Sequence, residues 1–153
     1  MMTNEYKEKL DKGLQYQDFV YEQLYNIGIS TVVYSSKIYQ FKIGENKAGI
    51  EIKFDDRMKD TGNIYFEVAE KSNANNKDFV PSGIFRSDNT WLYVIGDYSI
   101  IYVFPKKLLQ HIYNRQHYIK AGGRLVEIKT SKGFVLPVVY AEREVSAKTI
   151  NCT

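Results

Sequence analysis

Apolar and charged residues alternate without interruption over residues 49–55. An α-helix would distribute such a pattern around its circumference, whereas a β-strand sorts it onto two faces. The segment is therefore predicted to be a strand with one buried, apolar face. Its opposite face carries Glu51, Lys53 and Asp55, so three charged groups lie along one side of the strand.

The rest of the chain predicts further elements around this strand. Helices are expected over 4–26, where apolar residues recur at helical spacing, and over 106–115. Alternating or apolar runs predict strands at 37–43, 64–71, 91–95, 99–104, 125–129 and 133–140. Residues 72–90 are expected to form a long loop facing the substrate. The polar tail from about residue 142 is expected to fray.

This order of elements predicts an α+β fold, with helices flanking a central sheet that is mixed but mainly antiparallel. The strands at 49–55 and 64–71 are joined by a short polar connection and are predicted to form a hairpin. A length of 153 residues suits one domain, so 1–153 is taken as a single unit. No apolar run approaches the roughly 18 residues that cross a bilayer, so no membrane partner is expected.

The composition of the chain indicates its expected cellular location more clearly than its function. The single cysteine, Cys152, precludes an intramolecular disulfide and a cysteine-based zinc cluster, and the N-terminus lacks the pattern of a signal peptide. A cytoplasmic location is therefore expected. The net charge of +3 is compatible with a polyanionic partner, but it is far below that of a protein that packages nucleic acid. The 13 tyrosines and 8 phenylalanines suit half-buried sheets, with base stacking as the alternative.

The charged face of the strand at 49–55 carries the candidate chemistry. A hairpin register that sets Asp55 opposite Glu67 would bring their carboxylates together, with Lys53 beside them. Mg²⁺ prefers oxygen ligands from a few carboxylates and completes its shell with water and phosphate. Such an ion makes hydroxide available near neutral pH, and an ammonium group stabilises charge developing on phosphorus. This combination is suited to the hydrolysis of phosphodiesters.

The same charges also fit a simpler interpretation. A solvated strand face with cross-strand Glu–Lys pairs needs no function, and each pair is worth at most about 1 kcal/mol. A bare Glu-x-Lys is a weak signal, since the chain has a second copy at 127–129 to which no role is assigned. The charge pattern alone therefore does not establish a site.

The order of the elements adds a resemblance. GIEIKFD at 49–55 and GNIYFEVAEK at 62–71, set between a helix and a later strand and helix, resemble the PD-(D/E)xK nuclease superfamily over about residues 10–115. The resemblance implies a restriction-endonuclease-like fold and cleavage of DNA that depends on Mg²⁺ or Mn²⁺. Those enzymes carry an acid on the second core strand, then Asp/Glu-x-Lys on the third, and often a glutamate on the first helix. Such nucleases often act as homodimers.

One position departs from the family pattern. The lysine should lie two residues after Glu67, where this chain has Ala69. Lys53 could replace it from the neighbouring strand, or Lys71 could reach the site from further along. Alternatively, residues 51–53 are themselves the acid-x-lysine element, and Glu45 is the earlier acid.

With the resemblance, the expected metal ligands are Asp55, Glu67 and Glu51, with catalysis by these acids and Lys53 and auxiliary roles for Glu22 and Lys71. Separately, Lys106 and Lys107 at the start of the second predicted helix are expected to contact a nucleic-acid backbone, with a solvated helix face as the alternative. Two other readings remain open. One is a degenerate module of the same fold that binds nucleic acid or a protein without cutting, and the other is a β-rich interaction protein without a metal.

Overall fold

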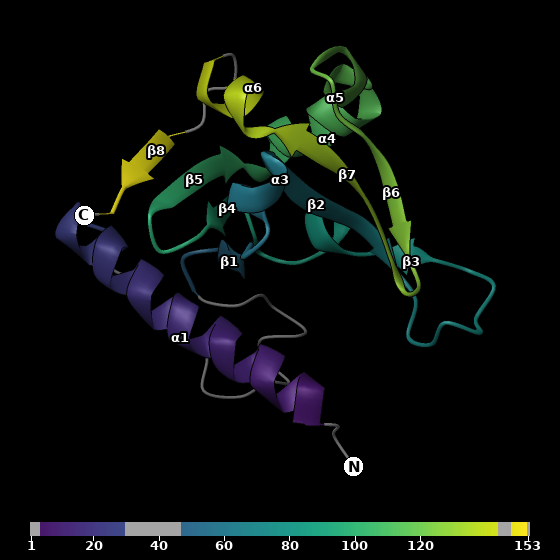
Figure 1. The fold of residues 1–153 in the computed structure, drawn as a ribbon, viewed down its shortest axis with the longest axis horizontal. Coiled ribbons are helices and arrows are strands. Elements are labelled where there is room, and N and C mark those ends of the chain that lie inside the picture. The colour runs from purple at the N-terminus through teal and green to yellow at the C-terminus, as the bar shows by residue number, and fades with distance from the viewer. Residues whose placement is uncertain (1–3, 30–46, 144–147, 153) are drawn as a thin grey trace.

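The computed structural model describes residues 4–29, 47–143 and 148–152, and over these ranges the chain has an α+β fold (Figure 1). Its described strands form two four-stranded sheets. The sequence predicted the α+β class correctly, but it predicted one central sheet where the structure has two. The strand predicted at 37–43 lies outside the described residues.

The first sheet has the strand order β1-β4-β5-β8. β1 is parallel to β4, whereas β4–β5 and β5–β8 are antiparallel pairs. The β4–β5 hairpin confirms the prediction that the chain reverses after residue 95, and Asp97 supports the turn by accepting the backbone N–H of Ser99. The bounds of the strands are β1 (Ile50–Phe54), β4 (Leu92–Gly96), β5 (Ile100–Pro105) and β8 (Lys148–Asn151).

The long helix α1 (Asn4–Asn26) covers one face of the first sheet and confirms the predicted N-terminal helix. Its buried residues Tyr16, Val20 and Leu24 recur every four positions and so share one helix face. That face packs on apolar side chains of β1, β4 and β5. Among the described helices, α1 included, there is none with the length and apolar content needed to cross a membrane.

The C-terminal segment differs from its prediction. α6 (Val138–Arg143) replaces the end of the strand predicted at 133–140, and β8 forms where a frayed tail was expected. Ile150 and Cys152 pack against the apolar cluster beneath α1. Burial of these side chains accounts for the ordered pairing of β8 with β5.

The second sheet is antiparallel throughout and has the order β3-β2-β7-β6. β2 pairs with β7 along nearly its whole length, with an irregularity in register between Glu67 and Ala69. The segment predicted as a loop at 72–90 contains β3 and the short 3-10 helix η1 (Gly83–Phe85). The bounds of the strands are β2 (Asn63–Glu70), β3 (Val80–Pro81), β6 (Arg124–Ile128) and β7 (Ser131–Pro137).

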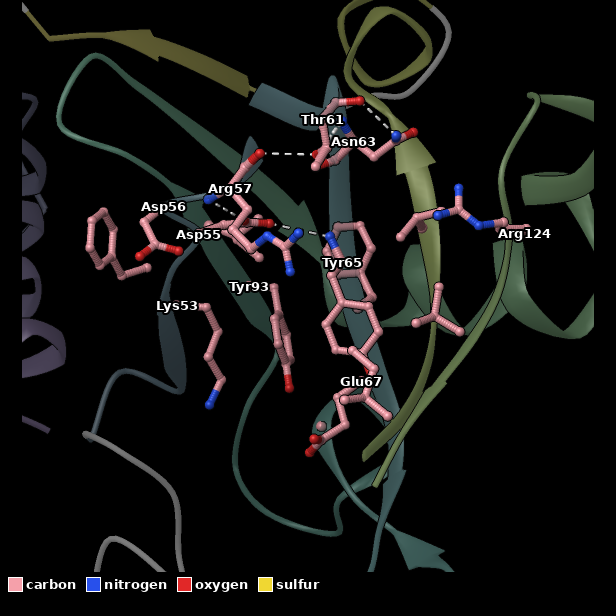
Figure 2. A pocket seen from close by; sticks show the side chains of 17 residues that line it. Lys53, Asp55, Asp56, Arg57, Thr61, Asn63, Tyr65, Glu67, Tyr93 and Arg124 are labelled. Atoms are coloured by element: carbon pink, nitrogen blue, oxygen red, sulfur yellow. Dashed lines mark hydrogen bonds between the residues drawn. The ribbon is translucent and has the colours of Figure 1, made fainter. Parts of the chain in front are cut away.

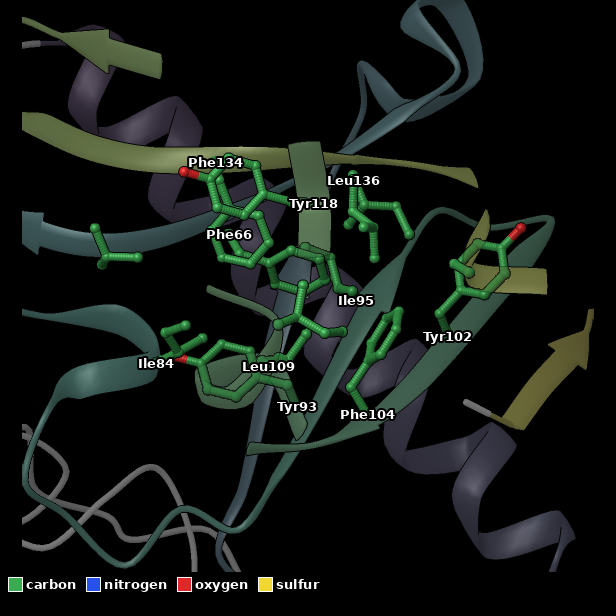
Figure 3. Packing of buried hydrophobic residues seen from close by; sticks show 14 of the residues in the cluster. Phe66, Ile84, Tyr93, Ile95, Tyr102, Phe104, Leu109, Tyr118, Phe134 and Leu136 are labelled. Carbon is green, nitrogen blue, oxygen red and sulfur yellow. The ribbon is translucent and has the colours of Figure 1, made fainter. Parts of the chain in front are cut away.

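The two sheets share a core with the helices α4 (Lys106–Asn114) and α5 (His117–Lys120). Figure 3 shows aromatic side chains of both sheets meeting in this core. The ring of Phe66 on β2 meets that of Phe104 on β5 edge-on, with centroids 5.2 Å apart, and stacks on that of Phe134 on β7. The sheets are therefore joined by packing, and their described strands form no backbone pairs with one another.

The hairpin predicted between the strands at 49–55 and 64–71 is wrong. β1 pairs with β4, and β2 pairs with β3 and β7. Between them, the short helix α3 (Met58–Thr61) ends at Gly62, which adopts a left-handed φ of 68°, and carries the chain from one sheet to the other. The prediction failed because alternation of apolar and charged residues determines which face of a strand is buried, but leaves its partner open.

Candidate functional site

A cavity of about 420 Å³ lies between β1 and β4 of the first sheet and β2, β6 and β7 of the second. It contains charged and aromatic side chains from several elements (Figure 2). Those used in the argument are Lys53, Asp55, Arg57, Tyr65, Glu67 and Tyr93. The predicted residues Lys53, Asp55 and Glu67 thus line one cavity, although their strands are not neighbours.

Asp55 follows β1 directly and connects the two sheets. Its Oδ1 accepts the backbone N–H of Arg57 at 3.1 Å, and its Oδ2 accepts that of Tyr65 at 3.3 Å. Burial raises the pKa of the Asp55 carboxyl, while backbone hydrogen bonds from Tyr65, Arg57 and Met58 oppose the rise and nearby Asp56 adds to it. These contacts, in place of the predicted strand pairing, bring the end of β1 to the beginning of β2.

Glu67 is held by two serine hydroxyls. Ser82 donates to its Oε1 at 2.7 Å and Ser131 donates to its Oε2 at 2.6 Å. The Tyr65 hydroxyl lies 2.7 Å from Ser131 Oγ and extends this chain of polar contacts. Ser82 is fully buried, so its hydroxyl is fixed by the surrounding packing. We call Ser82 and Ser131 the Glu67 clamp.

The backbone of η1 also fits closely against Glu67. Gly83 has a φ of +51°, and a Cβ at this position would collide with the carbonyl oxygen of Glu67. The segment predicted as a long loop therefore contributes both a hydroxyl and a close backbone contact to the site. Neither serine of the clamp was predicted, because the sequence does not show which serine will lie beside Glu67.

Lys53 and Glu51 form an ion pair on the charged face of β1. The Lys53 Nζ lies 2.7 Å from Glu51 Oε1, and the lysine side chain is 51% exposed whereas the glutamate is only 14% exposed. The pair neutralises Glu51 where water is scarce and leaves the ammonium group accessible at the cavity. Lys53 is accordingly the better placed of the two to contact a bound anion.

Tyr93 is a further cavity residue that the sequence prediction missed. It pairs across the sheet with Glu51 and is buried. Burial raises the pKa of its hydroxyl, and the nearby carboxylates of Glu51 and Asp88 raise it further. The hydroxyl therefore stays protonated near neutral pH and can donate a hydrogen bond. Its position within an apolar run predicted a core strand residue and gave no indication of this polar role.

Two auxiliary residues lie apart from the cavity. Glu22 is exposed on α1, which covers the face of the first sheet opposite the charged residues of β1. Lys71 donates to the carbonyl oxygens of Ala74 and Asn76, and its Nζ lies 4.7 Å from the centre of the Phe79 ring. Lys71 therefore organises the segment after β2. Glu45, the alternative first acid, lies outside the described residues.

The lysines predicted to contact nucleic acid differ in their surroundings. Lys106 is buried, with its Nζ 3.1 Å from Asp88 Oδ1 and bonded also to the carbonyl oxygen of Arg86. This ion pair anchors the segment before β4 to the beginning of α4. Lys107, in contrast, is exposed on α4. Of these two lysines, only Lys107 presents its ammonium group to solvent.

Asp55 and Glu67 supply carboxylate oxygens, the kind of ligand that Mg²⁺ prefers, at separate places along the cavity (Figure 2). A carboxylate has about four acceptor positions, so Asp55 and Glu67 retain capacity beyond the hydrogen bonds they accept here. Mg²⁺ is commonly held by one or two carboxylates, with water and substrate phosphate completing its shell. Within the described residues, no three or more His, Cys, Asp or Glu side chains form a group that could hold a metal by themselves. Any Mg²⁺ or Mn²⁺ bound here would therefore need water or a substrate phosphate among its ligands.

No known protein family, curated protein or solved structure matches this chain. The resemblance to the PD-(D/E)xK nucleases consequently rests on the residues of the chain itself. The function is argued below from the geometry and chemistry of the cavity.

Proposed function

We propose that this protein hydrolyses phosphodiester bonds of DNA with the help of Mg²⁺ or Mn²⁺, on a restriction-endonuclease-like fold, and that the cavity between the sheets is its active site. One observation carries the proposal. Lys53, Asp55 and Glu67, selected from the sequence as one catalytic set, line the same cavity even though the hairpin invoked to join them does not exist. A solvated strand face would not require these groups to converge from two sheets.

Each residue has a role that follows from its surroundings. Asp55 and Glu67 would hold the metal ion, which when bound supplies an activated water and polarises the phosphoryl group. The Glu67 clamp fixes the orientation of one carboxylate, and the backbone N–H groups bonded to Asp55 fix the other. Lys53 stabilises the charge that develops on the phosphoryl oxygens, in place of the lysine missing at Ala69.

Plasmid cleavage and metal binding test the proposal together. We expect the protein to nick or cut plasmid DNA with Mg²⁺ or Mn²⁺, and Lys53→Ala to lower the rate roughly 10²- to 10³-fold, the usual loss for one such electrostatic group. Lys71→Ala is the matched control and should leave the rate unchanged. Calorimetry should show Mn²⁺ binding that disappears in the double variant that combines Asp55→Ala with Glu67→Ala. Cleavage that persists in this double variant would show that the active site lies elsewhere.

A second candidate function is binding without cleavage on the same fold. It is favoured by Ala69 at the position of the family lysine and by the engagement of both Glu67 carboxylate oxygens with serine hydroxyls. This candidate predicts DNA binding with no Mn²⁺ binding and no cleavage. Sedimentation of the protein with and without DNA would also test the homodimer expected of an enzyme that cuts both strands.

A further inference from the structure

Trp91 is the only tryptophan of the chain and is 59% exposed. It lies directly before β4 and two residues before Tyr93, so strand geometry places both side chains on the same face. Tyr93 lines the cavity, and its partner Glu51 shares that face of the first sheet with Lys53. An exposed indole therefore lies on the same side of the first sheet as the proposed active site, two residues along the chain from the cavity residue Tyr93.

The indole is held in place despite its exposure. Its Nε1 donates to the carbonyl oxygen of Ala48 at 2.6 Å. A Cβ added at Gly49 would lie only 2.7 Å from the Cδ1 atom of this ring, and the φ of Gly49 is +69°. Glycine at position 49 therefore leaves room for the ring to lie against the backbone, and a residue with a side chain there would not. A ring that is fixed before binding loses little conformational freedom when a ligand covers it.

We propose that Trp91 is a stacking platform for an unpaired nucleobase, so that the substrate of the cavity is single-stranded nucleic acid or a strand with displaced bases. This inference rests on the proposed nuclease function and narrows its substrate. In a duplex the bases stack on each other, so an indole can cover a base only where the base is unpaired or extruded. Lys53 and Arg57 supply positive charge in the cavity for phosphates of the bound strand.

The size of the cavity agrees with a single nucleotide. Its volume of about 420 Å³ is within the range of small-molecule sites and is far too small for a double helix. The aromatic residues Tyr65 and Tyr93 line it together with the charged groups. A nucleotide needs both kinds of contact, because it joins a flat apolar base to an anionic phosphate.

The single tryptophan makes the test direct, because its fluorescence reports on this position alone. The probes are an oligothymidylate of roughly 15 nucleotides and a blunt duplex of the same length, added with Ca²⁺ in place of Mg²⁺ to limit cleavage. We expect the oligothymidylate to quench the fluorescence and to protect the indole from acrylamide, and the duplex to do neither. Fluorescence anisotropy of labelled probes gives the affinities independently.

Variants separate stacking from a general loss of binding. Trp91→Ala should weaken binding of the oligothymidylate roughly 5- to 150-fold, the usual effect of removing one stacked aromatic residue, and Trp91→Phe should weaken it less. Tyr25→Ala is the matched control, because Tyr25 is 70% exposed on α1, away from the cavity. If Trp91→Ala does not fold, the wild-type quenching and Trp91→Phe still decide the result.

The outcomes also separate this inference from the proposed function. Binding and cleavage of DNA with unchanged indole fluorescence and an unchanged affinity of Trp91→Phe and Trp91→Ala would overturn the stacking role and leave the nuclease standing. Equal affinity for duplex and oligothymidylate would overturn the preference for unpaired bases. Absence of both DNA binding and cleavage would overturn both proposals, and Trp91 would then be an isolated exposed apolar residue of the ordinary kind.

Discussion

At the scale of single residues, the site is defined by how its carboxylates are held. Glu67 accepts hydrogen bonds from two hydroxyls, one of them on the fully buried Ser82. Asp55 accepts two backbone N–H groups while burial raises the pKa of its carboxyl. The two acids are thus fixed by different means, one by side chains and the other by the backbone of the segment that follows it.

Ser82→Ala should destabilise the protein by about 1.5–3 kcal/mol, because a hydrogen bond from a buried hydroxyl to a charged carboxylate is lost. Urea denaturation measures the change. Ser99→Ala, in an exposed turn, is the control and should stay within about 0.5 kcal/mol of wild type. Equal stabilities of the two variants would show that the Glu67 clamp contributes no stability.

The Asp55 carboxyl should titrate above its ordinary pKa of 3.8, because burial outweighs the hydrogen bonds that oppose it. The folded protein then binds this proton more tightly than the unfolded chain does. The contribution of Asp55 to stability is accordingly greatest below pH 3.8 and falls as the pH rises through the pKa of the folded state.

NMR titration of the side-chain carbonyl of Asp55 checks the direction of this pKa shift. Asp56→Asn should lower the pKa, since the Asp56 charge adds to the rise, and a wild-type pKa at or below 3.8 would contradict the account.

At the scale of elements, the site depends on η1 lying directly against β2. The left-handed Gly83 permits this approach, since a side chain there would meet the Glu67 carbonyl oxygen. Gly13 in α1 is the opposite case, with no neighbouring atom within 4 Å of its Cβ position. Replacing each of these two glycines by alanine therefore distinguishes the effect of the contact between η1 and β2 from the effect of helix propensity alone.

Gly83→Ala should lower the free energy of unfolding by about 2 kcal/mol or more, through the left-handed φ and the collision with β2. Gly13→Ala should raise it by about 0.5–1 kcal/mol, because alanine favours the helix. Urea midpoints of the two variants and the wild type test both signs. A stability of Gly83→Ala equal to that of wild type would mean that η1 moves away from β2 at little cost.

At the scale of the whole molecule, the shared aromatic core is what unites the two sheets. The ring of Phe66 on β2 contacts the ring of Phe104 on β5 and that of Phe134 on β7. The cavity proposed as the active site lies between the same two sheets. Its geometry therefore depends on this packing, which sets how the sheets lie against each other.

Phe104→Ala should lower the stability by about 3–5 kcal/mol, the usual cost of truncating a buried phenylalanine. Because the core joins the sheets, we also expect a single unfolding transition. Far-UV circular dichroism, which follows both sheets, and Trp91 fluorescence, which follows the first, should give coincident curves. Two separated transitions would mean that the sheets unfold independently. Tyr25→Ala, on the exposed face of α1, should leave the midpoint nearly unchanged.

The sequence predicted individual helices and turns better than it predicted which strands pair. The helix at 4–26 was predicted correctly because apolar residues recur there at helical spacing, and the β4–β5 hairpin because a polar turn joins two apolar runs. The partner of β1 was predicted wrongly, since a parallel partner lies far along the chain and leaves no local pattern. The C-terminal tail is polar in sequence, so the pairing of β8 with β5 depends on contacts that only the folded protein supplies.

The candidate site shows the same division. The sequence proposed Lys53, Asp55 and Glu67, and the structure brings them to one cavity. Ser82 and Tyr93 were missed because a serine in a loop and a tyrosine in an apolar run are common at positions without a functional role. Chemical type and strand face are encoded locally, whereas the groups that orient a side chain come from distant segments.

The parallel pairing of β1 with β4 has a consequence for how the chain is synthesised. Residues 92–96, the partner of β1 among the described residues, emerge later than β1, and the intervening segment builds part of the other sheet. Long-range pairing of this kind slows folding and leaves strand edges exposed in the meantime. Pairing of β1 with β4 therefore waits until residues 92–96 have left the ribosome. The cavity is complete only once β6 and β7, which also line it, have followed.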